Sequence, residues 1–155
     1  MTASSEPRWL SADEQKVWRS YLMATHMLAA RLEQQMQGDA AIPMAYYEIL
    51  VRLSESPDRT LRMSELSSAS FQSRSRLSHA VARLEEAGWV ERRACPTDRR
   101  GALAVLTDEG FAALAKAAPG HVEAVRSDLF DALSPAQVRT LGEIAEKIAN
   151  HLTAR

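Results

Sequence analysis

The sequence of 155 residues has little of several features that mark other classes of protein. Its single cysteine excludes an internal disulfide framework. No apolar run approaches the roughly 18 residues of a membrane span, and the opening stretch MTASSEPRWLSADEQ lacks the apolar core of a signal peptide. The sequence therefore predicts a cytoplasmic protein with no membrane partner, built as one domain or one domain with an appended element.

Motifs of enzymes and metal sites are also missing. The four histidines are scattered and form no H-x-x-x-H pair, and there is no cysteine cluster. No Gly-rich phosphate loop follows a predicted strand, and no serine lies in a G-x-S-x-G elbow. We therefore predict that the chain is not an enzyme and that it holds no metal and no cofactor.

What the sequence does contain is an uneven distribution of charge. The whole chain has a formal net charge of −1. Residues 59–100 carry nine Arg against five Asp or Glu, a balance of +4, whereas residues 1–58 and 101–155 carry −3 and −2. A basic segment between acidic flanks is expected of a surface that contacts phosphate. A solvated charged face would give the same composition.

Apolar periodicity predicts a mainly helical chain. Ser11 and Glu14 form a capping box at the start of the first helix. Pro119-Gly120 should kink or break the fifth helix, because proline lacks the N–H that a helix interior needs. The expected helices cover 11–39, 43–57, 63–69, 74–87, 107 onward with the interruption at 119–120, and 134 onward.

Residues 73–107 have the layout of a winged helix-turn-helix. Ser73 is the expected N-cap of the helix at 74–87, and Gly88 is its expected left-handed C′ residue. Two short strands follow, at 89–94 and 102–106, joined by the arginine-rich turn CPTDRRG. The predicted fold class is therefore mainly α with a small β-hairpin wing (α+β), and the predicted partner is double-stranded DNA.

Both terminal helices carry apolar stripes that the winged unit does not need. In the last helix the apolar residues repeat at spacings of 3, 4, 3 and 4, as in an a/d seam; they are Val138, Leu141, Ala145, Ile148 and Leu152. Burial against a second copy is the simplest use of these stripes, and folding back onto one monomer is the alternative. We therefore expect a dimerisation helix at 1–43, a winged DNA-binding domain at 44–107, and C-terminal helices at 108–155 that complete the dimerisation domain.

Several segments occur in a fixed order, namely YYEILVRLSE, MSELSSAS, RLEEAGWVERR, DRRG and LTDEG, and the last three are specific as a set. In these segments, and over nearly its whole length, the sequence resembles the MarR family of bacterial winged helix-turn-helix transcriptional regulators. The resemblance implies a homodimeric, ligand-responsive repressor that binds a near-palindromic operator. It also implies that Asp98 steadies the wing while Arg100 enters the minor groove.

The predicted DNA contacts lie on the helix at 74–87 and on the wing. Arg74 or Arg76 is expected to contact guanine in the major groove, and Arg83 to hold a phosphate. A two-fold dimer would need half-sites roughly 10 bp apart or a multiple of that spacing. The full predicted set is Ser73, Arg74, Ser75, Arg76, Ser78, His79, Arg83, Asp98, Arg99 and Arg100.

The resemblance also implies a small aromatic or phenolic inducer, bound between the terminal helices and the winged unit. Its predicted contacts are Trp18, His26, Met44, Tyr46 and Tyr47. Aromatic and methionine side chains at helical spacing are also what an ordinary hydrophobic core contains. Two other functions stay open: a winged-helix protein–protein interaction module, and a thiol-based redox regulator that acts through Cys95, whose arginine neighbours favour a thiolate.

Overall fold

The computed structural model describes residues 7–70, 73–95 and 98–154. Its elements are α1 (Ala12–Asp39), α2 (Met44–Ser54), η1 (Pro57–Arg59), β1 (Thr60–Arg62), α3 (Met63–Ala69), α4 (Arg74–Glu86), β2 (Val90–Cys95), β3 (Asp98–Leu106), α5 (Asp108–Asp128), η2 (Phe130–Ala132) and α6 (Pro135–Thr153). The predicted fold class, mainly helical with a small antiparallel sheet, is confirmed.

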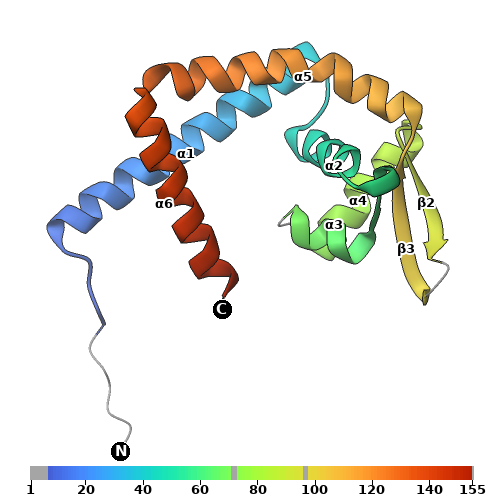
Figure 1. Cartoon of the computed structure of the whole chain (residues 1–155), viewed down its shortest axis with the longest axis horizontal. Helices are drawn as coiled ribbons and strands as arrows, with labels where there is room; N and C mark the ends of the chain where they lie inside the picture. The colour runs from blue at the N-terminus through green and yellow to red at the C-terminus, as the bar shows by residue number, and fades with distance from the viewer. Residues whose placement is uncertain (1–6, 71–72, 96–97, 155) are drawn as a thin grey trace, which may run out of the picture.

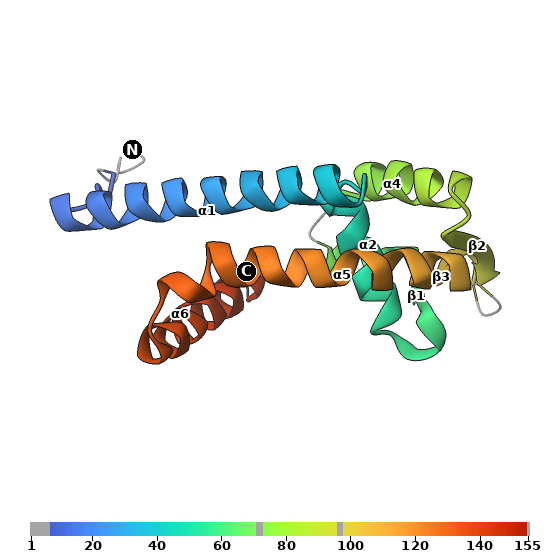
Figure 2. The same ribbon diagram turned by 90° about the horizontal axis from the view of Figure 1, so that it is seen from above.

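The elements form a long helical arm with a compact winged unit at one end (Figure 1). The arm consists of α1 and α5, which run alongside each other in opposite directions, as Figure 2 shows from above. Arg31 of α1 and Asp128 of α5 form an ion pair of 3.0 Å across this arm. The winged unit of α2–α4 and the sheet lies at the start of α5, and α6 leaves the other end (Figure 1).

One apolar core holds the winged unit together and attaches it to the arm. It draws on α2, α3, α4, β2, β3, the end of α1 and the first half of α5. Removal of this apolar surface from water is the main source of stability, at roughly 25 cal/mol per Å². The largest fully buried side chains are Met36, Ile49, Leu50, Leu53, Leu66, Leu77, Val81, Leu84 and Val90.

The helix boundaries follow from local capping interactions, as the sequence predicts. The Ser11 hydroxyl accepts from the backbone N–H of Glu14, and the Glu14 carboxylate accepts from the N–H of Ser11. The Ser73 hydroxyl accepts from the N–H of Arg76 at the start of α4. Gly88 has φ of +75° just beyond the end of α4, a conformation that costs a glycine little. These predicted caps are confirmed.

The predicted break at Pro119 is wrong, because α5 continues through it to Asp128. Proline costs the helix one hydrogen bond, but packing on both sides of it holds the helix. Ala117 is buried in the core two residues before, and the His121 ring contacts Tyr47 two residues after. Tertiary contacts therefore outweigh the local preference for a break.

Strand β1 is not predicted from the sequence. It pairs antiparallel with β3, Leu61 opposite Ala104, which gives the sheet order β1-β3-β2. Three residues are too few for apolar alternation to be visible in the sequence.

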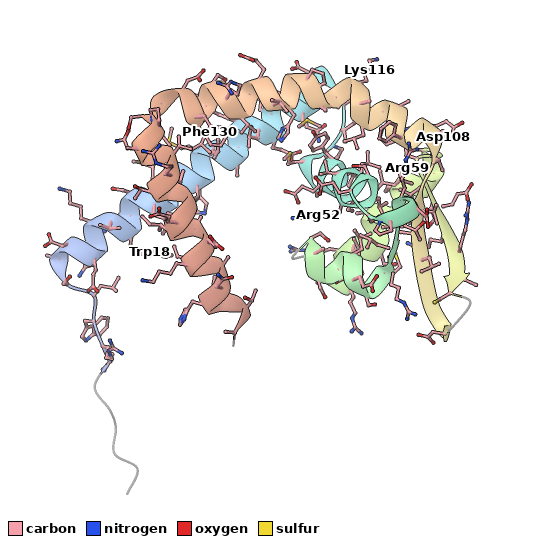
Figure 3. All side chains as sticks on the ribbon, in the orientation of Figure 1. Trp18, Arg52, Arg59, Asp108, Lys116 and Phe130 are labelled. Carbon is pink, nitrogen blue, oxygen red and sulfur yellow. The ribbon has the colours of Figure 1, made fainter. Side chains whose placement is uncertain are left out.

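Just before β1, Arg59 has a left-handed φ of 52°. Its guanidinium lies 4.0 Å from the centre of the Phe111 ring and pairs with Asp108 at 3.0 Å (Figure 3), which fastens β1 to the first turn of α5.

The part of α1 away from the winged unit and the neighbouring α6 (Figure 1) expose many large apolar side chains. Trp18 on α1 is 49% exposed, and Ile148 on α6 is 43% exposed. The group continues with Val17, Tyr21, Met23, Met27, Leu141, Ile144 and Leu152. The alternative in which these stripes fold back onto one monomer therefore does not describe this chain, since the faces stay open. None of the described helices has the length and apolar character that crossing a membrane requires.

Candidate nucleic-acid interface

The polar face of α4 is the first part of the candidate site. The buried residues of this helix recur every three or four positions, which fixes one face against the core; they are Leu77, Ala80, Val81 and Leu84. The opposite face is therefore open to solvent. It presents most of the predicted helix contacts: Ser73, Arg74, Ser75, Arg76, His79 and Arg83.

The arginines of this face differ in how they are engaged. Arg83 donates to Glu86 at 2.7 Å, and this hydrogen bond raises the pKa of Arg83. Arg74 and Arg76, near the start of the helix, form no ion pair with any other described residue. The start of α4 is therefore the more available end for an anionic ligand, since the partial positive charge of a helix N-terminus also favours anions.

Ser78 stands apart from the other predicted helix contacts. It is half-buried, and its backbone carbonyl accepts a hydrogen bond from Arg92 Nη2 at 2.7 Å. Arg92 lies on β2, so this side of α4 faces the wing. The structure therefore places Ser78 beside the wing.

The wing is longer than the sequence predicts. Its strands β2 and β3 reach Cys95 and Asp98, which face each other across the register irregularity that follows Ala94. The predicted turn placed 98–101 between the strands, whereas the structure places these residues in β3. Asp98 is exposed. For Arg99 and Arg100 the structure describes only the backbone, within β3. Their proposed contacts with DNA therefore stay predictions.

A cleft of about 390 Å³ lies between α3, α4 and the wing. Three arginines from three elements line it, namely Arg62, Arg74 and Arg92, together with Ser64 and Asp98. Arg62 and Arg92 belong to the basic segment of the sequence but were not predicted as site residues. Their place in the cleft could not be predicted from the sequence, because it depends on how β1 and β2 bring these residues beside α4.

The predicted inducer contacts are not brought together. Figure 3 places Trp18 on α1, away from the winged unit, where its ring stacks on Tyr21 with 6.2 Å between centroids. His26 is exposed on the same helix. Tyr46 is half-buried at the start of α2 and does not line the cavity described next. Met44 and Tyr47 alone among the five line a shared cavity, of about 380 Å³.

His121 is the residue of this cavity that sequence reasoning missed. The cavity is also lined by Arg52, which Figure 3 shows on α2, and by Glu48. The His121 ring lies 4.7 Å from that of Tyr47. Burial lowers the pKa of His121 and raises the pKa of Tyr47, so both groups are neutral near pH 7. A lone histidine within a helix gives no sign in the sequence of what it will contact.

Cys95 is 7% exposed at the end of β2. Reactive cysteines lie in accessible, electropositive surroundings, whereas buried ones are inert. The burial of Cys95 therefore gives no support to the redox alternative.

Comparison with known proteins adds independent findings. The model of the MarR family matches residues 42–101. The chain is 55% identical to Sco3205 of Streptomyces coelicolor, a MarR family transcriptional regulator solved in complex with DNA. That structure superposes with a TM-score of 0.91 over 94% of this chain and 92% of the other. For AbsC, another MarR family transcriptional regulator of Streptomyces coelicolor, identity is 43% and TM-score 0.90, over 96% and 100% of the chains.

The sequence is also similar over most of its length to a transcriptional repressor. This relative is the transcriptional repressor MprA of Escherichia coli, which is 29% identical over 132 residues, or 84% of this chain and 74% of that protein.

Proposed function

The chain belongs to the MarR family of transcriptional regulators, and from this premise we propose that it binds a near-palindromic DNA operator as a homodimer and represses transcription there. As a member of a family of regulators it is not an enzyme, as its sequence predicts. The observation that carries the proposal is the exposed arginine face of α4 beside the basic cleft and wing. The family likeness to a regulator solved with DNA supports the same partner.

We assign α4 to the major groove and the wing to the minor groove. Arg74 and Arg76 are free of intramolecular ion pairs among the described residues, so their forks are available for guanine edges or phosphates. The remaining contacts of this proposal are Ser73, Ser75, Ser78, His79, Arg83, Asp98, Arg99 and Arg100. A protein–protein interaction module has no need of cations at both of these elements, and the alternative is less well supported for that reason.

We assign the dimer interface to the exposed apolar faces of α1 and α6. The exposed apolar side chains occur in groups along these two helices and not as single scattered residues. A two-fold axis would place two copies of α4 toward one side of a duplex and produce half-sites roughly 10 bp apart or a multiple of it. The division into 1–43, 44–107 and 108–155 stays part of this proposal.

We place the small aromatic or phenolic inducer in the cavity of Tyr47 and His121. This cavity lies among residues of α2, α3 and α5, so a ligand there touches both the winged unit and the arm. Arg52 supplies a cation for a carboxylate. Titration of bound operator with benzoate-type acids tests this assignment: Arg52→Ala should lose the release that Arg19→Ala, on the exposed surface of α1, retains. Equal release by the two variants would remove Arg52 from the ligand site.

Selection of bound duplexes from a random pool tests the function directly, since it gives half-site sequence, symmetry and spacing together. The selected operator then serves in anisotropy titrations at matched salt. Arg76→Ala and Arg100→Ala should weaken operator binding strongly. They should also make the negative slope of the logarithm of the association constant against the logarithm of salt concentration shallower, by about 0.9 for each phosphate that the variant no longer binds. Arg139→Ala, which removes an exposed arginine from α6, is the control. Failure of the wild-type protein to retain any duplex at low salt would overturn the proposal.

A further inference from the structure

Arg92 of β2 ties the wing to the recognition helix α4 through contacts with Glu85 and Ser78. Its Nε lies 3.0 Å from Glu85 Oε2. Its backbone N–H donates to Glu85 Oε1 at 3.0 Å. Its Nη2 donates to the backbone carbonyl of Ser78 at 2.7 Å. Both Glu85 and Ser78 belong to α4, so one residue of the neighbouring strand holds two points along the helix.

The geometry uses the properties of an arginine fork. Both oxygens of the Glu85 carboxylate are engaged by the same residue, one by the side chain and one by the backbone. The far end of the guanidinium then reaches Ser78, seven residues before Glu85 and close to two turns along the helix. Lysine, with one point charge and no planar fork, has no means of making both contacts at once.

We propose that Arg92 is a positioning residue that sets the orientation of the wing relative to α4, so that helix and wing reach adjacent grooves of one duplex together. The inference rests on the proposed function. In the chain, α4 and β2 are connected by the short segment 87–89. The base of the hairpin is held by the buried residues Val90 and Leu106 and by the pairing of β3 with β1. Arg92 adds a direct side-chain link from β2 to α4, which fixes the angle between the wing and the helix.

The rival assignment makes Arg92 a phosphate contact, because Arg92 also lines the cleft with Arg62 and Arg74. The two assignments differ in what they require of Glu85. A carboxylate 3.0 Å from the guanidinium offsets its charge and repels a phosphate. As a positioning device, in contrast, Arg92 needs that carboxylate. The effect of removing the Glu85 charge therefore has opposite signs under the two assignments.

The decisive experiment is operator binding by Glu85→Gln at several salt concentrations. Positioning predicts weaker binding, by about three- to tenfold, with an unchanged salt slope. A phosphate contact predicts tighter binding, because a negative charge near DNA has been removed. Glu86→Gln is the matched control, since it removes the same charge one residue along α4 and should bind as well as the wild type or better. Tighter binding by both variants would overturn the proposal.

Arg92→Lys provides a second, independent comparison. The variant keeps the positive charge, so a phosphate role predicts near wild-type binding, whereas positioning predicts a loss close to that of Arg92→Ala. A double-mutant cycle with Arg100→Ala gives a further test. Once the wing is misplaced, removal of Arg100 should weaken operator binding little further, so the two effects on the binding free energy should be less than additive. Full additivity, or wild-type affinity in Arg92→Lys, would overturn the proposal.

These results separate the inference from the function on which it rests. If wild-type protein binds no duplex, the proposed function fails. If wild-type protein binds and Glu85→Gln and Arg92→Lys bind equally well, the function stands and the positioning role fails. Thermal unfolding of each variant checks that the fold is kept, and the two conservative variants are the ones expected to keep it.

Discussion

The imidazole of His121 packs against the ring of Tyr47, with 4.7 Å between the centroids and 55° between the planes. The contact joins the middle of α5 to the first turn of α2, and so joins the arm to the winged unit. Nδ1 of His121 is buried and has no hydrogen-bond partner within the part of the chain that the structure describes. Burial of this kind disfavours the charged imidazolium and lowers the pKa of His121.

This relationship predicts a pH-dependent stability. In the unfolded chain His121 titrates near its ordinary pKa of about 6.5. In the folded chain it takes up a proton only at lower pH. The unfolded state therefore binds more protons as pH falls below about 6.5, and the stability due to neutral His121 is lost in that range. His121→Phe keeps an aromatic contact without a titrating group. Melting temperatures from pH 8 to 5 should fall more steeply for the wild type than for His121→Phe, and parallel curves would contradict the assignment.

Gly110, in the first turn of α5, should tolerate no side chain. A Cβ at this position would overlap the backbone oxygen of Trp89, which also accepts from the N–H of Thr107. Gly110→Ala should therefore destabilise the fold by about 1–3 kcal/mol or more, because backbone at the wing must shift. Gly38→Ala is the control: nothing lies within 4 Å of a Cβ there, and a helix gains up to about 1 kcal/mol from the change. Chemical denaturation measures both, and equal stabilities would contradict this account.

The exposed face of α6 should prove to be an interface between subunits. Ile148→Glu places a charge within the apolar seam and should shift the protein from dimer to monomer, with loss of operator binding. Asn150→Glu adds the same charge on the opposite face of α6 and should remain dimeric. Light scattering coupled to size-exclusion chromatography gives the mass of each. A wild-type protein of monomer mass, or a dimeric Ile148→Glu, would refute the assignment of this face.

The thiol of Cys95 should be unreactive in the native protein. Its side chain is buried at the end of β2, so a disulfide reagent has little access to it. Reaction with an aromatic disulfide should be slow in buffer and complete in denaturant. Mild peroxide should leave operator affinity unchanged. Rapid labelling of native protein, accompanied by loss of DNA binding, would restore the redox hypothesis.

Much of the DNA-facing helix was predictable because its signals are local. The spacing of Leu77, Val81 and Leu84 defines the buried face of α4, and Ser73 and Gly88 define its ends. The solvent-facing arginines then follow from the helical period alone.

The features that the sequence did not predict depend on contacts between distant residues. Residues 60–62 form a strand because β3 lies beside them, and Pro119 stays within α5 because of packing on both sides. The link from Arg92 to Ser78 spans 14 positions, and that from Arg59 to Asp108 spans 49. Such pairings are set by the three-dimensional arrangement and leave no periodic trace in a single sequence.

The uninterrupted course of α5 has a geometric consequence. Its 21 residues form a strut of about 31 Å that starts at the wing and ends next to α6. Each residue added to such a strut lengthens it by about 1.5 Å and rotates one end against the other by about 100°. A single insertion near Pro119 would therefore turn the wing away from its groove while every local contact of the hairpin survived. In the proposed dimer, the length of α5 would therefore help to set the distance between the two copies of α4, and with it the spacing of the half-sites.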